Sequence, residues 1–213
     1  MQIVACEQGT AEWHEARLGI PTASCFGKIV TSTGTASKQA ADYMDELLGE
    51  WLTGASKDGY TSTWMARGTE LEPDGRLWYE FAHDVTVQQV GFVMRDNGLV
   101  GGSPDGLVGD DGGLEIKCPA PGTHIGYLRT GKIPAKYVPQ VQGGMWVCDR
   151  QWWNFVSYHP SIEPLVVRVQ RDEKFVDSLS ALVGRFVEKM LEEREKLITK
   201  GYHPKCQTTI TSV

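Results

Sequence analysis

A run of short strand patterns between helical patterns is the feature that most constrains the fold of this chain. Residues 85–94 alternate apolar and polar side chains, with a shift of register near Gln88 and Gln89 that indicates a bulge. The Asn97-Gly98 turn and a DDGG turn at 110–113 then mark out two further strands, 99–108 and 113–117. These three strands are predicted to form a meander.

Helical spacing of apolar residues predicts helices on both sides of these strands, at 11–18, 22–29, 40–53, 70–82 and 134–147, and from Asp172 onward. In the 70–82 helix, Pro73 falls early enough to be tolerated, and the predicted inner face is Leu71, Leu77, Trp78 and Phe81. Two more strands, 152–158 and 165–170, precede the last helix. This order predicts an α/β fold with a central mixed sheet flanked by helices.

Length and composition describe an ordinary globular protein. The 213 residues are predicted to form one domain at 1–200 and a tail at 201–213, with 41% hydrophobic and 23% charged residues. No apolar stretch approaches the roughly 18 residues of a membrane span, and no signal-peptide pattern opens the chain, so a cytoplasmic protein is expected. Five cysteines without a C-x-x-C pair predict reduced thiols. A net charge of −6 excludes a uniformly basic surface, so any phosphate-binding site must be local.

One pair of motifs carries chemistry. Ser103-Pro104-Asp105 and Glu115-Ile116-Lys117 are separated by nine residues. Side chains two apart on a strand share a face, so Glu115 and Lys117 should lie together, and the DDGG turn can bring Asp105 beside them. Two carboxylates and the Ile116 carbonyl are hard oxygen donors that suit Mg²⁺ or Mn²⁺.

Each motif alone also has an ordinary structural explanation. A Glu-x-Lys on a strand is typical of a solvated ion pair, and Ser-Pro-Asp-Gly is typical of a turn. Their combination at a hairpin spacing favours phosphodiester hydrolysis, in which bound metal ions activate a water molecule and stabilise the attacking and leaving oxygens. The Lys117 ammonium would offset the charge of the transition state.

The motifs resemble the PD-(D/E)xK nuclease superfamily and, within it, the lambda exonuclease or YqaJ-like viral recombinase group of alkaline exonucleases. The resemblance runs from EQGTAEWHEARLGIPTAS through ARGTELEPDGR, GGSPDGL, GLEIKCP and YVPQVQGGMWV to RDEKF. It implies a restriction-endonuclease-like core and a Mg²⁺-dependent exonuclease. Such an enzyme digests the 5′-ended strand of double-stranded DNA and leaves a 3′ overhang for recombination by strand annealing.

The resemblance also implies cofactors and partners. It implies two Mg²⁺ ions, with Mn²⁺ as a substitute, a homotrimeric ring around DNA, and a single-strand annealing recombinase as a protein partner. The substrate end is expected to carry a 5′ phosphate. No membrane partner is expected.

Catalysis and metal binding are assigned by the resemblance to one set of residues: Asp105, Glu115 and the Ile116 carbonyl as metal ligands, Lys117 as the catalytic lysine, with Glu72 and Gln140 in support. Glu72 is favoured over Glu70 because residues two apart on a helix point in nearly opposite directions. Gln140 is favoured over Gln142 in the Q-x-Q block.

A 5′-phosphate pocket is also implied. Arg17 would grip the phosphate, helped by the hydroxyl groups of Thr22, Ser24 and Ser103, because a guanidinium binds phosphate oxygens through two parallel donors. An ordinary surface arginine is the alternative for Arg17. Met65 matches the family's strand-separating wedge, which is usually leucine, and core packing is the alternative for it. Candidate contacts to the DNA channel are Lys28, Lys38, Lys57, Lys132 and Lys136.

Two other functions remain open at this stage. A sequence- or structure-specific endonuclease could use the same core, and a supercoiled plasmid distinguishes it, because an exonuclease needs an end. A DNA-binding or assembly protein with a degenerate metal site is the second alternative. The presence of Asp105, Glu115 and Lys117 argues against a degenerate site.

Overall fold

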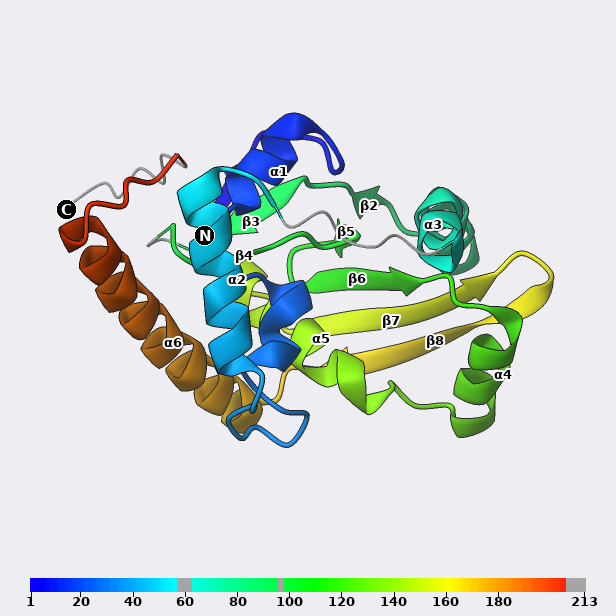
Figure 1. Cartoon of the computed structure of the whole chain (residues 1–213). Coiled ribbons are helices and arrows are strands. Elements are labelled where there is room, and N and C mark those ends of the chain that lie inside the picture. Colours follow the sequence, from blue (N-terminus) through cyan, green and yellow to red (C-terminus); the bar gives the residue numbers. More distant parts are fainter. Residues whose placement is uncertain (57–62, 96–97, 206–213) are drawn as a thin grey trace.

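The computed structural model describes residues 1–56, 63–95 and 98–205, without the side chains of residues 63–66. Figure 1 shows a sheet with helices around it. The elements in chain order are β1 (Gln2–Val4), α1 (Ala11–Arg17), the 3₁₀ helix η1 (Ala23–Lys28), α2 (Ala40–Thr53), α3 (Thr63–His83), β2 (Val87–Gln88), β3 (Phe92–Met94), β4 (Gly101–Gly102), β5 (Gly106–Val108), β6 (Gly112–Lys117), α4 (Pro121–Thr130), the 3₁₀ helix η2 (Ala135–Tyr137), α5 (Val138–Cys148), β7 (Trp152–His159), β8 (Ile162–Gln170) and α6 (Glu173–Thr199).

The main sheet has five strands in the order β2-β5-β6-β7-β8. The β6–β7 pair is parallel and the other pairs are antiparallel, so the sheet is mixed, as predicted. One face packs against α3, where Ile116 and Val156 lie with Tyr79 in a buried cluster. Helices α4 and α5 contact strands of the same sheet (Figure 1), and Trp153 packs with Val141 of α5 in a second cluster. The predicted α/β fold with flanking helices is confirmed.

The antiparallel pairing order of the predicted three-strand meander is confirmed, but its first two strands are divided between two sheets. Strands β3 and β4 form a separate three-stranded sheet with β1, whereas β2, β5 and β6 belong to the main sheet. The residues between β2 and β3 therefore connect two sheets and do not form a bulge within one strand. Glycine makes this sheet possible at β4, because a Cβ at Gly101 would lie 2.1 Å from the Phe92 ring.

Helix α3 differs from its prediction in length and in orientation. It begins at Thr63, so Pro73 lies in the helix interior and not near its start. Leu77 and Phe81, predicted to face inward, are 64% and 90% exposed. Tyr79 is buried, and Gly75 lies so close to the sheet that a Cβ would sit 3.1 Å from an Ile116 methyl. Leu71 and Trp78, also predicted to face inward, are partly buried and do pack against the cluster at the sheet. A glycine that faces the sheet carries no hydrophobic signal, so the apolar period was wrong for Leu77 and Phe81.

The remaining helices follow the predicted order, with local differences. Gly54, with φ of 67°, closes α2 where a stop was expected, and the Asp172 carboxylate accepts from Phe175 N at the start of α6. The predicted helices 22–29 and 134–147 contain 3₁₀ turns, η1 and η2, and α5 begins only at Val138. Helix α4 and strand β1 were not predicted. The predicted tail 201–213 is described only to residue 205.

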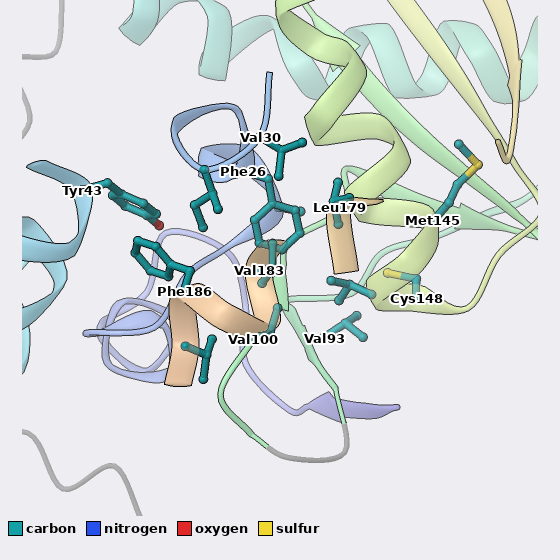
Figure 2. Packing of buried hydrophobic residues seen from close by; sticks show 14 of the residues in the cluster. Phe26, Val30, Tyr43, Val93, Val100, Met145, Cys148, Leu179, Val183 and Phe186 are labelled. Carbon is teal, nitrogen blue, oxygen red and sulfur yellow. The ribbon is translucent and has the colours of Figure 1, made fainter. Parts of the chain in front are cut away.

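A hydrophobic core joins η1, α2, α5 and α6 with the small sheet. Figure 2 shows Phe26, Val100, Met145 and Leu179 in this core, contributed by segments far apart in the sequence. Four cysteines in the described residues are free thiols, while Cys206 lies outside them. None of the described helices is long and apolar enough to cross a membrane.

Candidate nuclease site

The β5–β6 hairpin brings the two candidate metal-binding carboxylates to neighbouring strands. Asp105 directly precedes β5, and its backbone N–H donates to the Leu114 carbonyl at 3.2 Å. Its side-chain Oδ2 accepts a hydrogen bond of 2.5 Å from the Ile116 N–H. The Asp105 carboxylate is thus fixed against β6, the strand that carries Glu115.

Glu115 is the centre of the side-chain contacts at this site. The residue is 3% exposed, and its Oε1 accepts from Gln140 Nε2 at 2.5 Å. The same oxygen forms an ion pair with Lys117 Nζ, so the two side chains share a face of β6 as predicted. Gln142 instead contacts the Gln170 carbonyl and the Asp172 N–H, which makes it a structural link to β8 and α6.

Helix α3 adds Glu72 and Arg76 to the site. Arg76 Nη1 lies 3.7 Å from Glu72 Oε1 and donates to the backbone carbonyl of Asp105 at 2.9 Å. Arg76 was not singled out from the sequence. Its position four residues after Glu72 was the available signal, because residues at that spacing meet on one helix face.

Burial is the largest influence on the pKa values of the carboxylates at this site. Burial, followed by the charge of Glu115, raises the pKa of Asp105 well above its usual range. Burial also raises the pKa of Glu72, against the opposing charges of Arg76 and Lys117. Burial alone would lower the pKa of Lys117, but Glu115 and Asp105 outweigh it and raise that pKa. Lys117 is therefore a stable cation, and the protein's own charges do not fully compensate the carboxylates.

The donor set fits a hard divalent cation. Asp105 and Glu115 each use one oxygen in the contacts above, and a carboxylate has two. No group of three His, Cys, Asp or Glu side chains among the described residues is arranged to hold a metal. The protein ligands that fit Mg²⁺ are therefore the carboxylates of Asp105 and Glu115 and the carbonyl of Ile116. Mg²⁺ is usually bound by one or two carboxylates and keeps several water ligands, so this set suits it.

Arg17 lies in a second group of polar residues, around Ser103. The Ser103 hydroxyl accepts from Arg17 Nη1 at 2.9 Å and from Trp13 Nε1 at 2.8 Å. The Arg17 guanidinium stacks over the Trp13 ring, 4.0 Å from its centroid. Thr22 and Ser24 are joined by a hydroxyl–hydroxyl hydrogen bond of 3.2 Å. The predicted phosphate-binding residues therefore form two hydrogen-bonded pairs.

Two pockets adjoin these residues, and the smaller one also reaches Glu115. A small one of about 10 Å³ is lined by Ser24, Ser103, Glu115 and Gln140, so both groups adjoin it. A wider cleft of about 460 Å³ has Arg17 and Thr22 in its wall. That volume is within the range of sites for small ligands.

Sequence reasoning missed two supports of the site. Gln8 Nε2 donates to the Val90 and Pro104 carbonyls, at 3.0 and 2.8 Å, and so holds the loop that precedes Asp105. Tyr137 lies beside Lys117, whose Nζ is 5.5 Å from the ring centroid. Met65 belongs to the first turns of α3, but its side chain lies outside the described residues, so the wedge role stays a prediction.

Comparisons with known proteins cover the part of the chain that carries these residues. The model of the YqaJ-like viral recombinase domain matches residues 12–151, which include every candidate site residue. ExoD of Escherichia coli (strain K12) is 40% identical over 63 residues, which cover 28% of this chain and 72% of that protein.

Solved structures give the same result over a longer stretch. An alkaline exonuclease (LHK-Exo) from Laribacter hongkongensis is similar, with a TM-score of 0.82 and 36% identity over 90% of this chain and 98% of that one. Its complex with dAMP gives a TM-score of 0.81 and the same identity and coverage. A phage-related exonuclease from Haemophilus somnus shares the fold, with a TM-score of 0.62 and 17% identity over 82% of this chain and 96% of that one.

Proposed function

The chain belongs to the YqaJ-like viral recombinase family, and we propose that it is a Mg²⁺-dependent deoxyribonuclease that removes nucleotides from the 5′-ended strand of double-stranded DNA. Digestion in this direction leaves a 3′ overhang, the substrate for recombination by strand annealing. The observation that carries the proposal is the group of Asp105, Glu115 and Lys117 on one hairpin, beside Arg17 and Ser103. The similar exonuclease from Laribacter hongkongensis supports it.

The chain's own residues account for positioning and charge. Asp105, Glu115 and the Ile116 carbonyl would hold Mg²⁺, while Gln140 fixes Glu115 through its hydrogen bond. Mg²⁺, with Mn²⁺ as a substitute, would supply an activated water there and would stabilise the attacking and leaving oxygens. Lys117 remains protonated beside Glu115 and offsets negative charge on the transition state.

Arg17 would select the end of the DNA. Its guanidinium, oriented by Ser103 and Trp13, offers donors to a terminal 5′ phosphate, and Thr22 and Ser24 offer hydroxyl groups nearby. A phosphate held there would adjoin the pocket that Ser103 shares with Glu115. The dAMP complex of the similar exonuclease is consistent with a deoxynucleoside monophosphate product.

The proposal extends to assembly and partners. A homotrimeric ring around the duplex would keep the enzyme on DNA by topology, without tight contacts that slow its movement. The 3′ overhang would pass to a single-strand annealing recombinase.

Digestion of a linear duplex, labelled separately at each 5′ and 3′ end, tests the activity. The proposal expects loss of the 5′ label first, only with Mg²⁺ or Mn²⁺, and an intact supercoiled plasmid under the same conditions. Cleavage of the supercoiled plasmid would indicate an endonuclease instead. Equal loss of both labels, or no digestion with either ion, contradicts the proposal.

A further inference from the structure

The segment from Ile116 to Cys148 contains no acidic residue, although acidic side chains outnumber basic ones by 27 to 21 in the whole chain. It carries Lys117, Arg129, Lys132 and Lys136. The segment covers the end of β6, α4, η2 and α5, so it continues directly from the candidate catalytic lysine (Figure 1). Its charge is opposite in sign to the net charge of −6. We call residues 116–148 the basic segment.

Three of its cations are exposed and uncompensated. Arg129 lies in the last turn of α4, Lys132 follows that helix, and Lys136 lies in η2. In the part of the chain that the structure describes, none of the three pairs with a carboxylate. Lys28, by contrast, is held by Glu46 at 2.5 Å, so its charge is already compensated.

Tyr137 connects Lys136 to the candidate catalytic centre. Lys136 Nζ lies 4.7 Å from the centroid of its ring, and Lys117 Nζ lies 5.5 Å from the same centroid. The ring packs against Phe155, with centroids 5.2 Å apart, and Phe155 is the register partner of Glu115. Tyr137 therefore lies between the exposed Lys136 and Lys117, which pairs with Glu115.

Helix α1, which ends at Arg17, and helix α4, whose last turn carries Arg129, lie on opposite sides of β6 (Figure 1). Ser103, the partner of Arg17, shares the small pocket with Glu115 and Gln140. Lys117 lies two residues after Glu115 on β6, so their backbone positions are roughly 6.6–6.8 Å apart along the strand. The Lys117 ammonium lies beside Tyr137, whose ring also contacts Lys136. A strand whose 5′ phosphate is at Arg17 and whose cleaved linkage is at Glu115 would continue toward the basic segment.

We propose that Arg129, Lys132 and Lys136, together with Tyr137, bind the DNA backbone on the side of the cleaved linkage opposite to the Arg17 pocket. This rests on the proposed function, because it takes DNA as the substrate and Glu115 as the place of cleavage. Lysine and arginine bind phosphates through a sequence-independent attraction that releases counterions, and an aromatic ring between them offers a stacking surface. The contact is therefore suited to a strand of any sequence.

A charge-neutralising variant tests this binding surface. Arg129→Gln/Lys132→Gln/Lys136→Gln is compared with Lys174→Gln/Arg185→Gln/Lys189→Gln, which removes the same charges from exposed positions on α6. Affinity for a fluorescent 5′-phosphorylated duplex is measured by anisotropy in Ca²⁺, over a range of salt concentrations. Each phosphate contact contributes about 0.7–0.9 to the slope of log K against log salt, so the first variant should lose about 2–3 in slope. The α6 variant should keep the slope of the wild type.

Equal slopes for the two variants would overturn the inference. Thermal unfolding of both variants checks that neither is misfolded. The single variant Lys136→Gln, which changes the protein least, should lose about 0.7–0.9 in slope. Wild-type digestion of a linear duplex is measured in parallel. If the wild type does not digest DNA, the proposed function fails. If it does, and the triple variant still binds with the wild-type slope, only the assignment of the basic segment fails.

Discussion

Replacement of Arg17 by alanine removes the cation of the proposed 5′-phosphate pocket and disturbs few other contacts. Arg17 Nη1 donates to the Ser103 hydroxyl at 2.9 Å, and its guanidinium covers the Trp13 ring. The Ser103 hydroxyl would still accept from Trp13 Nε1, at 2.8 Å here, so it keeps a partner in the variant. The change in cleavage rate should therefore report the lost charge and donors.

The expected magnitude follows from the number and type of interactions lost. A terminal phosphate carries about −1.5 to −2 charge near pH 7, and a hydrogen bond to a charged group contributes about 1.5–3 kcal/mol. Burial lowers the pKa of Arg17, but a guanidinium still stays protonated at working pH. The loss corresponds to about a 10- to 150-fold preference for phosphorylated ends. Arg17→Lys should keep part of it, because lysine retains the charge without the two parallel donors.

Initial rates on linear duplexes with a 5′ phosphate or a 5′ hydroxyl measure this preference. The wild type, Arg17→Ala, Arg17→Lys and a control, Arg185→Ala on the exposed surface of α6, are compared on both substrates. We expect the wild type and the control to share the preference, and Arg17→Ala to lose most of it. A wild type that ignores the phosphate, or an Arg17→Ala variant that keeps the full preference, would refute the pocket.

Four shorter predictions concern the carboxylates and the assembly. Asp105→Ala, Glu115→Ala and Lys117→Ala should each lower the cleavage rate by at least about 10²–10³ with unchanged circular dichroism, and a loss of only a few-fold would contradict the site. Saturating Mg²⁺ should raise the melting temperature of the wild type by about 5–10 °C, as expected near a hundredfold excess over Kd, but not that of Asp105→Asn. Without metal, the free energy of unfolding should fall as pH rises above 3.8, because burial and Glu115 raise the pKa of Asp105 in the folded protein. Chemical denaturation of the wild type and of Asp105→Asn over a range of pH measures this effect. The same pH profile for both proteins would argue against it. Light scattering at micromolar concentration should give a trimer, and a monomer would contradict the ring.

The hairpin of the site could be predicted because its information is local. The DDGG turn, the two-residue period of a strand and the spacing from Asp105 to Glu115 together determine which side chains meet. The contact of Arg17 with Ser103 joins residues far apart in the sequence, and no periodicity encodes it. Only the resemblance to a family placed those two residues together.

Other elements were missed because their residues carry weak signals. Helix α4 has the sequence PGTHIGYLRT, in which two glycines and a proline suggest a loop, and its buried residue is His124. His124 is held by Ser157 and by the Glu163 carbonyl, contacts that exist only in the folded protein. In β4, two glycines stand where a strand pattern needs side chains, so the division into two sheets could not be seen.

The charges of the site imply that the proposed enzyme would bind DNA mainly through contacts away from the cleaved bond. Before Mg²⁺ binds, phosphate oxygens would approach Asp105 and Glu115 against like charge, because Lys117 alone does not compensate both carboxylates. Contacts remote from the cleaved bond can supply the free energy for that approach, and Arg17 and the basic segment lie where they would do so. Binding through these cations brings no sequence preference, which suits an enzyme that must remove every nucleotide it meets. An acidic chain can therefore process DNA when its few uncompensated cations lie beside the carboxylates.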